Sequence, residues 1–501
     1  MLLWFRSVRD LSLRLVAVIL AVAVWVAPAA ASTLHRGLGP APDSLDPHRA
    51  QGLAAFNLLR DLHEGLLTRD AHGNPVPGVA RSWQVSEDGR VWRFRLRDGA
   101  RWSDGLPIVA GDFVRGWRRA RDPATASPVA GWLEPVVAAE APEDDLLIVR
   151  LVRRVPWFEE LLTLPLTVPW PEAHAPRYSG AFMLQRRIAG ARFELVRNPH
   201  FHAADRVELD GVVWHVTEDP GAELSRFRAG ELHVTETVPP GRLDWLRREL
   251  GPAVRVSPYL GSFYLVFNLS RPPFDGDPRI RRALSLAIDR DILVERVLGS
   301  GELPAMRLVP PGLPGWPEYQ RPESGDHRLR RARALLREAG HGLDNPLRVE
   351  LRFNTSLTNR RLGAAIAAMW KQHLGVVTRL VNEEWKVFVT NRRQGRITQI
   401  VRGGWIADWA DPGNFLGLFA GDSALNYAFL RDPEFDALLD RAEMLSGPAR
   451  TDVLWRAEQR LLDRHAIIPL YFYVSRHLVV PELRGWEDNP MDIHLSRWLA
   501  L

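Results

Sequence analysis

Between residues 347 and 385 the hydrophobic pattern changes period twice, and this limits the folds open to the chain. "LRVELRF" alternates apolar and polar residues, as a half-buried strand does. "RRLGAAIAAMWKQHLG" then has helical spacing and ends at Gly375, and "VVTRLVNEEW" is again typical of a strand. A strand, a helix and a second strand in this order predict parallel pairing, so we expect a doubly wound α/β lobe.

The flanking segments predict further elements of both kinds. "RVWRFRL" alternates as a half-buried strand does, and a helix is expected to start near Asp112, with Phe113, Val114 and Trp117 on one face. "PRIRRALSLAIDRDILVERVL" is strongly amphipathic, which predicts a helix. We also expect a strand at "ITQIV", helices at about 433–446 and 449–464, and a final apolar strand at "IIPLYFYV".

The N-terminus has the order of a secretory signal. Three arginines precede the apolar run "LVAVILAVAVWVAPAAA", which ends in the small residues Ala29, Ala30 and Ala31. A membrane anchor is the alternative, but the apolar core from Leu15 to Val26 is short for a span of about 20 residues. We therefore expect residues 1–31 to be a signal peptide cleaved after Ala31, which places the mature protein in the periplasm.

The composition excludes several classes of protein. The 501 residues include no cysteine, so an exported chain relies on its core without disulfides and offers neither a thiol nucleophile nor a thiolate metal site. The net charge is +5, and only Lys371 and Lys386 are lysines. The positive charge is therefore arginine scattered among acids, without a nucleic-acid recognition motif, and we expect no nucleic-acid partner.

The chain offers no convincing catalytic or metal site. G-x-S-x-G, H-E-x-x-H and P-loop motifs are absent from the sequence. The histidines are dispersed, and the nearest pair, His200 and His202, is more typical of a surface loop than of a metal site without a third ligand. We therefore expect no catalytic residues, no metal and no cofactor.

The stretch "GGWIADWADPGNFLG" sets two acids among tryptophans. Asp411 precedes Pro412, and Asp-Pro is a common turn starter. Asp408 lies between Trp405 and Trp409, where an unpaired charge is costly. Asp408 is therefore either a helix cap or salt-bridge partner, or it binds a cation that arrives from outside.

An ordered series of motifs carries a family resemblance. These are "LGPAPDSLDPH", "RDLHEGLLTRD", "PGVARSW", "VWRFRLRDGARWSDGLPIVAGDFV", "DPATASP", "FNLSRPPF", "RRALSLAIDRD" and "GWIADWADPGNFL". The series, which covers essentially all of the mature chain, resembles the periplasmic oligopeptide-binding proteins of ABC importers, in the peptide/nickel solute-binding family 5. The resemblance implies an α/β, periplasmic-binding-protein-like clam of three lobes, with hinge closure of lobes I and III around the ligand. The implied lobes are 32–63 with 176–260 and 475–501 (lobe I), 64–175 (lobe II, an insertion) and 261–474 (lobe III).

The resemblance also implies a set of ligand-binding residues. Asp408 matches the carboxylate that holds the α-ammonium group of the peptide, and Gly404, Trp405 and Ile406 match the segment that pairs with its backbone. Leu53 matches a facing position in lobe I. Other matches are the pocket-lining positions Asn354, Trp385, Tyr264 and Tyr473, and the carboxylate-binding cations Arg392 and Arg402.

The sequence departs from the family at several of these positions. Leu298 replaces a carboxylate-binding lysine, Asn359 a histidine of the same role and Val129 a backbone-contacting tyrosine, while Gly261 and Ile406 stand where close relatives have a cysteine pair. Capture of the amino end is expected to be intact. Capture of the carboxyl end depends on arginine, which leaves murein peptides, with their extra carboxylates, as possible ligands.

These observations leave three classes of function. The first is an oligopeptide receptor that delivers its ligand to the permease subunits of an ABC transporter at the inner membrane. We expect such a receptor to be a monomer. The second is a binder of murein peptide or another solute, such as a sugar, an opine or a metal chelate. The third is an exported hydrolase. For single residues the alternatives are an internal ion pair for Asp408, exposed charges for the two arginines, and core positions for Trp385 and Trp405.

Overall fold

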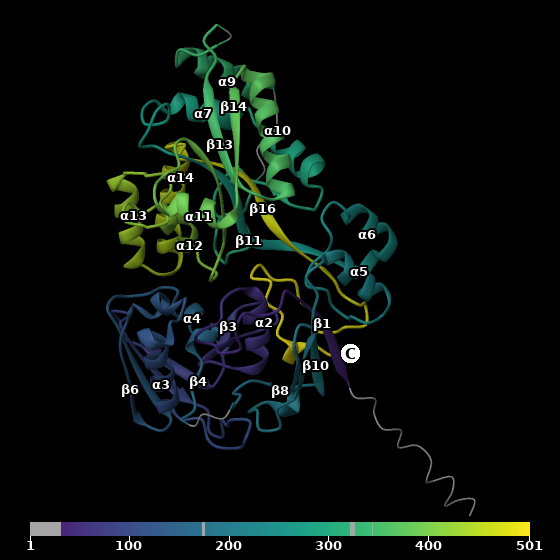
Figure 1. The fold of residues 1–501 in the computed structure, drawn as a ribbon. Helices are drawn as coiled ribbons and strands as arrows, with labels where there is room; N and C mark the ends of the chain where they lie inside the picture. Colours follow the sequence, from purple (N-terminus) through teal and green to yellow (C-terminus); the bar gives the residue numbers. More distant parts are fainter. Residues whose placement is uncertain (1–31, 173–175, 321–325, 343) are drawn as a thin grey trace, which may run out of the picture.

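The computed structural model describes residues 32–172, 176–320, 326–342 and 344–501. The expected signal peptide, residues 1–31, lies outside these ranges, so cleavage after Ala31 stays a prediction. Among the helices in the described ranges, none has both the length and the apolar character that crossing a bilayer requires. Figure 1 shows two bodies, one above the other, that are joined on one side of the molecule.

The upper body is built on a six-stranded mixed sheet. Strands β13 and β14 flank α10 (Leu357–Leu374) in the sequence and pair in parallel, from Arg348 opposite Val377 to Asn354 opposite Glu383, which confirms the strand–helix–strand prediction. β15 is also parallel to β13, whereas β11, β16 and β12 join by antiparallel pairing. The order is β12 (Leu303–Pro304), β16 (Ile467–Leu478), β11 (Val254–Phe267), β15 (Ile400–Ile406), β13 (Arg348–Asn354) and β14 (Val377–Glu383).

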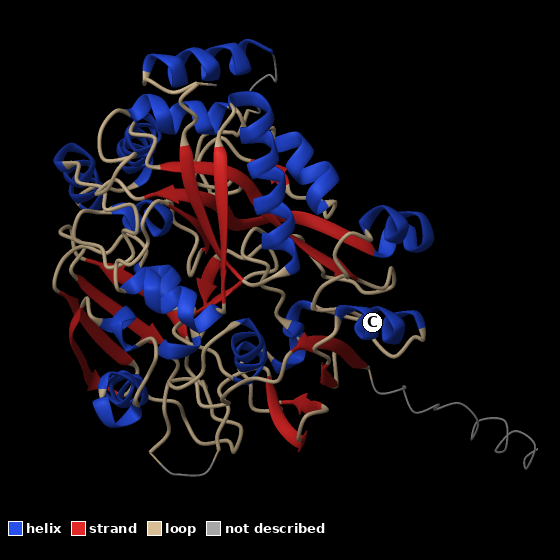
Figure 2. Ribbon diagram, turned by 45° about the horizontal axis from the view of Figure 1, so that its top comes forward, coloured by secondary structure: helices blue, strands red, loops and turns tan. Residues whose placement is uncertain are grey.

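Helices cover both faces of this sheet, as Figure 2 shows. Alternate residues of β11 point to opposite faces, so Phe263 and Leu265 join one hydrophobic cluster and Tyr264 and Val266 join another. The first cluster packs against α7 (Pro278–Leu286), the π-helical η6 (Leu293–Leu298) that follows the short α8 (Arg290–Ile292), α9 (Asp326–Glu338) and α10. The second packs against α11 (Trp385–Arg393), α12 (Gly413–Leu416), α13 (Pro433–Glu443) and α14 (Gly447–Asp463).

The lower body contains two four-stranded sheets, each with its own core. One has the order β1 (Thr33–Gly39), β10 (Gly211–Val216), β9 (Arg192–Arg197) and β8 (Phe182–Ile188), and α2 (Leu53–Leu62) packs on it. The other has the order β4 (Ala80–Val85), β5 (Val91–Leu96), β7 (Leu146–Leu151) and β6 (Val136–Glu143). It packs against α3 (Ala110–Arg121), where Phe113 and Trp117 are buried as predicted, and against α4 (Phe158–Leu161). A short ribbon of β2 (Leu67–Arg69) and β3 (Pro75–Pro77) completes the body.

Two long strands connect the bodies. β11 and β16 run side by side out of the six-stranded sheet toward α5 (Pro220–Arg228) and α6 (Leu243–Leu250), as Figure 1 shows. Their register is interrupted between Pro258 and Ser262, and such a bulge locally disrupts the ladder and bends the strand. The arrangement is the multi-lobed clam that the resemblance implied, with this strand pair as the connection.

The single helix expected over residues 278–298 is divided into α7, α8 and the π-helical Leu293–Leu298, because Asp289 caps a new helix at Arg290. Two element boundaries also differ from the sequence-based expectation. Trp385 begins α11 instead of ending a strand, because the Glu384 side chain accepts hydrogen bonds from the backbone N–H groups of Lys386 and Val387 and so caps the helix. β15 begins at Ile400 and continues to Ile406, so it extends further along the chain than "ITQIV" suggested. Both differences place the glycine–tryptophan stretch in a regular strand next to a helix.

A buried arginine joins the helices of the upper body to its sheet. Arg290, 4% exposed, follows the helix cap Asp289. Its Nε donates to the carbonyl oxygens of Ala305 (3.0 Å) and Pro469 (2.8 Å). Its Nη1 donates to the carbonyl oxygens of Ser285 (3.1 Å) and Ile288 (3.2 Å). One guanidinium therefore satisfies four carbonyls from three segments, and burial lowers its pKa to about 10, which keeps it charged at neutral pH.

We expect Arg290→Met to lower the free energy of unfolding by about 3 kcal/mol or more, because several buried carbonyls lose their donor at once. Urea denaturation followed by circular dichroism measures this loss. The matched control is Arg330→Met on α9, where the arginine is exposed and the change should stay within about 0.5 kcal/mol. Equal urea concentrations at the midpoint of unfolding for the two variants would contradict the structural role of Arg290.

Candidate ligand-binding site

A cavity of about 330 Å³ lies where the two bodies face one another. The lower body contributes the start and one face of α2, including Leu53, together with Val129. The upper body contributes the end of β15 and the loop after it, including Ile406 and Asp408. The fold thus brings three of the expected ligand-binding residues into one space, together with Val129, which stands where the family has a tyrosine.

A second cavity, of about 230 Å³, lies further back along β15 and shares no lining residue with the first. It is lined by side chains from β11, α11 and β15. Six of the expected residues meet here: Tyr264, Trp385, Arg392, Arg402, Gly404 and Trp405. Trp385 is 50% exposed, so it is not the core residue that was the alternative interpretation.

Asn354 and Tyr473 line neither cavity. Asn354 ends β13, and its backbone and side-chain oxygens both accept hydrogen bonds from Asn359 Nδ2, at 3.1 and 2.9 Å. Tyr473 packs edge-on against Phe263, and its ring lies so close to β11 that a Cβ at Gly261 would meet its Cδ2 at 2.6 Å. The ligand roles of both residues stay predictions.

The two positions that match the cysteine pair of close relatives lie opposite each other. Gly261 of β11 and Ile406 of β15 are partners in the antiparallel register. The ring of Tyr473 occupies the space beside Gly261 that a side chain would need, which gives a steric reason for glycine here.

The second half of β15 is paired along one edge only. Residues 402–406 pair with β11, but β13 reaches β15 only at Ile400 and Val401, and within the described ranges no other strand pairs with the remaining edge. A strand with an unpaired edge presents free N–H and C=O groups that another extended chain can bind. This edge runs from the arginine-lined cavity to the cavity that holds Asp408.

The two acids of the tryptophan-rich stretch have different partners. Asp411 is 7% exposed; it accepts two hydrogen bonds from Arg450, at 2.6 and 2.9 Å, and one from the backbone N–H of Gly413. Asp408 is half-buried, and no described arginine, lysine or histidine forms an ion pair with it. Loss of hydration raises the pKa of Asp408 to about 6, and the nearby Asn414 side chain opposes this shift. Asp411 is thus structural, and Asp408 has no internal counter-ion.

The indoles around Asp408 also have separate roles. Trp405 lines the second cavity, and its Nε1 donates to Asn414 Oδ1 at 2.7 Å. Trp409 extends from the same loop to the lower body, where it stacks on Trp157 at 4.3 Å and meets Trp132 edge-on at 6.3 Å. Trp409 therefore joins the two bodies next to Asp408, a role that the sequence did not reveal because its partners lie far away in the chain.

The two arginines of the second cavity rest on aromatic rings. The Arg392 guanidinium lies 4.4 Å from the centre of the Tyr427 ring, and that of Arg402 lies 5.2 Å from Phe263. The Nε of each is buried without a hydrogen-bond partner, and no described acid forms an ion pair with either. Burial lowers the pKa of Arg392, although an arginine stays charged at neutral pH. Both guanidinium groups are thus able to receive an anionic group.

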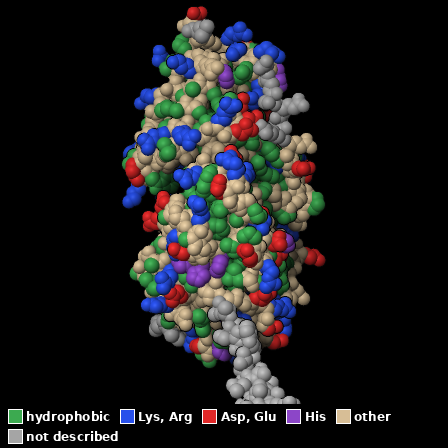
Figure 3. All heavy atoms as spheres, turned by 90° about the vertical axis from the view of Figure 1, so that its right-hand side faces the viewer, with side chains coloured by type: hydrophobic (Ala, Val, Ile, Leu, Met, Phe, Trp, Pro, Cys, Tyr) green, Lys and Arg blue, Asp and Glu red, His purple; other side chains and the backbone are tan. Residues whose placement is uncertain are grey.

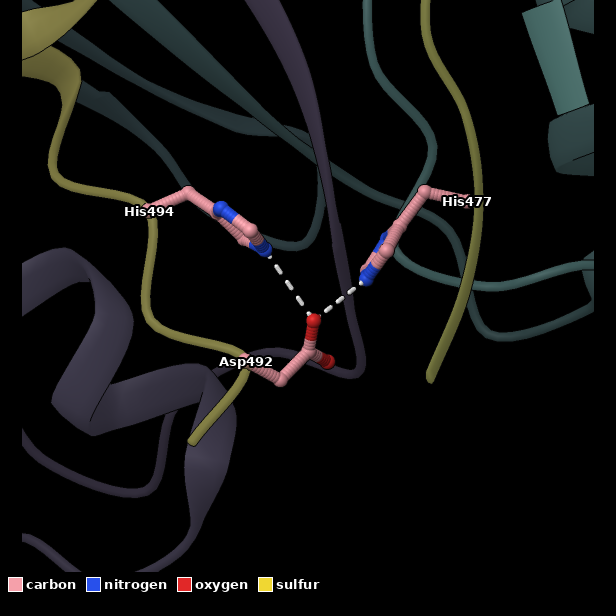
Figure 4. A group of neighbouring side chains, drawn as sticks. All are labelled: His477, Asp492 and His494. Carbon is pink, nitrogen blue, oxygen red and sulfur yellow. Dashed lines mark hydrogen bonds and ion pairs between the residues drawn. The ribbon is translucent and has the colours of Figure 1, made fainter. Parts of the chain in front are cut away.

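The sequence missed a group of ionisable residues behind the first cavity. Figure 4 shows His477 and His494, whose Nε2 atoms lie 2.8 and 3.1 Å from the same oxygen of Asp492. His477 also donates through Nδ1 to the carbonyl oxygen of Thr235. Burial alone would lower the pKa of His477, but Asp492 raises it to about 9. The side-chain atoms of these three residues that could bind a metal lie within 4.8 Å of one another. Because the carboxylate already accepts from both imidazoles, we assign no metal to the group.

The comparisons with known proteins agree with this geometry. The family model of the bacterial extracellular solute-binding proteins, family 5, matches residues 74–427. The chain belongs to this family.

Curated relatives align along almost the whole chain. The periplasmic oligopeptide-binding protein OppA of Escherichia coli is 36% identical over 501 residues, which cover 93% of this chain and 92% of OppA. The periplasmic murein peptide-binding protein MppA of the same organism is 32% identical, with 93% of each chain covered.

Solved structures of family members superpose on almost the whole chain. The unliganded open form of MppA superposes with a TM-score of 0.85 at 32% identity, covering 94% of this chain and 98% of that one. OppA of Haemophilus influenzae in complex with the peptide RPPGFSPFR superposes with a TM-score of 0.75 at 30% identity. The superposition covers 94% of this chain and 99% of that one. Both comparisons give the fold of a solute-binding protein with a site lined from two bodies.

We expect the Asp408 carboxyl group of the ligand-free protein to titrate near pH 6, well above its ordinary value of 3.8, because burial disfavours its charged form. Asn414→Ala should raise the pKa further, since it removes the group that opposes the shift. Carbon-13 NMR of the aspartate carboxyl carbons measures both, with Asp408→Asn to assign the signal. Trp405→Phe, which removes the indole bound to Asn414 but keeps the amide, is the matched control and should leave the pKa unchanged.

Proposed function

We propose that the chain is a periplasmic receptor that captures oligopeptides by their backbone and termini and delivers them to an ABC transporter for import. One observation carries the proposal: a carboxylate without a counter-ion lies at the end of a strand that has one unpaired edge. The names of OppA and MppA, both periplasmic peptide-binding proteins, support it.

In this mode the peptide adds a strand to the sheet. Its N–H and C=O groups pair with the free edge of residues 402–406, which suits broad specificity because every peptide presents the same backbone groups. Its α-ammonium group binds Asp408, and side chains enter the two cavities, where water completes their hydrogen bonds. Its carboxylate, or an acidic side chain, reaches Arg392 or Arg402.

We further propose three lobes: 32–63 with 176–260 and 475–501, then 64–175, then 261–474. The hydrophobic clusters support this division, since the core of the β4–β7 sheet draws only on residues between Leu66 and Leu166. Closure would turn the lobes about β11 and β16 near the bulge at Pro258–Ser262. The receptor would act as a monomer, after export and removal of residues 1–31, and would dock on the permease subunits of the transporter.

A murein peptide is a second candidate ligand. The observation that favours it is the pair of arginines without acidic partners, since murein peptides carry carboxylates in addition to the terminal one. MppA, at 32% identity, supports the same candidate. A sugar, an opine or a metal chelate would leave the uncompensated Asp408 without its ammonium partner. A hydrolase is disfavoured because the relatives described above are named as binding proteins.

We expect Asp408→Asn to weaken peptide binding about a hundredfold or more, because the ammonium group then enters the closed cleft without a counter-ion, at a cost of about 3–5 kcal/mol. Affinity of the unmodified protein should fall as the pH is lowered through about 6, where Asp408 becomes protonated. It should not fall in this range for the Asn variant, since the peptide amine, with a pKa of about 8, stays charged.

N-acetylated peptides provide the control for this interaction. Acetylation removes the ammonium group, so its effect and that of Asp408→Asn should not add. Calorimetry of both peptides with both proteins measures the coupling. If acetylation and Asp408→Asn lower the binding free energy additively, or if acetylated peptides bind tightly, Asp408 does not bind the amino end of the peptide.

We expect Arg392→Met or Arg402→Met to lower the affinity for peptides with a free C-terminal carboxylate about tenfold or more. The affinity for the same peptides as C-terminal amides should not change. Calorimetry with peptides of two to five residues, each as acid and as amide, would show which length each arginine serves. Arg393→Met is the matched control, because Arg393 is adjacent on α11 but exposed. Equal losses for acids and amides would contradict a carboxylate-binding role.

A further inference from the structure

One face of α2 lines the first cavity from the lower body. Leu53, Phe56, Asn57 and Arg60 recur at helical spacing and all contribute to the cavity wall. Asp408 reaches the same cavity from the upper body. The side chains at the far end of this face therefore meet whatever binds next to Asp408.

Arg60 is a cation without a compensating anion. No described aspartate or glutamate forms an ion pair with it, and its one hydrogen bond is from Nη1 to Asn57 Oδ1 at 3.2 Å. Its Nε is buried and has no partner, and the Phe56 ring lies 5.8 Å from its guanidinium carbon. Burial lowers its pKa to about 9, so it stays positive at neutral pH. A desolvated charge of this kind is costly unless a partner of opposite charge is supplied.

The other acids of the cavity do not provide that partner. Asp492 is bound by His477 and His494. Burial raises the pKa of Glu236 to about 8, which keeps this carboxyl group largely protonated at neutral pH. The cavity therefore contains one uncompensated cation, Arg60, on the lower body, and one carboxylate without a cation, Asp408, on the upper body.

The amino end of α2 adds to the positive character of this wall. Its N-cap is Gly52, at φ 86°, which offers no side-chain acceptor, and the first turn contains no acid. The first N–H groups of the helix are thus uncapped, and this is the positive end of the helix dipole. Gln51, Gly52 and Leu53 all line the cavity, so an anion in it meets both features.

We propose that Arg60 and the amino end of α2 form an anion subsite, and that the preferred ligands are peptides with an acidic side chain in one of their first two residues. The inference rests on the proposed function and specifies its substrate class. The position follows from the geometry, since Arg60 shares its cavity with Asp408, whereas the cavity of Arg392 and Arg402 is separate. An anion that reaches Arg60 therefore belongs to the residues nearest the ammonium group.

Calorimetry with two matched pairs of tripeptides tests the subsite: Glu-Ala-Ala against Gln-Ala-Ala, and Ala-Glu-Ala against Ala-Gln-Ala. The unmodified protein should bind the acidic member of at least one pair about tenfold more tightly. Arg60→Met should abolish the difference by weakening the binding of the acidic peptides much more than that of the glutamine peptides, and Arg60→Lys, which keeps the charge, should retain part of the difference. Thermal unfolding checks the fold, and Arg60→Met should not lower the melting temperature, because it removes an uncompensated charge.

Two outcomes would overturn the subsite while leaving the proposed function intact. One is equal binding of acidic and glutamine peptides by the unmodified protein. The other is an equal loss of affinity for the acidic and the glutamine peptide of a pair in Arg60→Met. That result would mean that the guanidinium binds a backbone carbonyl. Failure of all four peptides to bind the folded protein would instead overturn the proposed function itself.

Discussion

The antiparallel pairing of β11 with β15 is the interaction on which the site depends. β11 has β15 along one edge and β16 along the other, and with β16 it also forms the connection between the two bodies. The same ladder therefore fixes the direction of β15 and relates it to the lower body. Because β13 stops pairing at Val401, the rest of β15 keeps a free edge that extends from one cavity to the other.

Close packing around this ladder explains why its residues are small. Gly403 lies against the ring of Tyr264, and a Cβ there would overlap the ring. Gly404 lies beside the Tyr473 hydroxyl group, 3.2 Å from where a Cβ would be. The two glycines let the Tyr264 ring of β11 and the Tyr473 hydroxyl group of β16 approach the strand, and the Tyr264 ring also lines the second cavity. The proposed backbone recognition thus depends on the same glycines that make room for the two tyrosines.

The sequence predicted what depends on local pattern, and it missed what depends on chain segments that meet only in the fold. The change of hydrophobic period gave β13, α10 and β14, and Asp-Pro correctly marked Asp411 as structural. The alternating pattern wrongly extended a strand to Trp385, because in the fold a single capping residue, Glu384, starts a helix at this position. Arg60 was missed because it looks like any other helical arginine until the cavity face of α2 is known. His477 and His494 likewise gain meaning only through Asp492 between them.

The distribution of charge also bears on why a ligand would be needed for closure. Asp408 and Arg60 lie on different bodies, line the same cavity and form no ion pair with each other. Closing an empty cleft around them would exclude water and leave both charges without hydration, which is unfavourable. A peptide in the proposed mode supplies an ammonium group to one, an anion to the other and backbone groups to the free edge of β15. These contacts exist fully only in the closed state, and a ligand shifts such an equilibrium only by its difference in affinity for the two states. In the proposed mode, the two uncompensated charges would therefore make closure conditional on a ligand of matching charge.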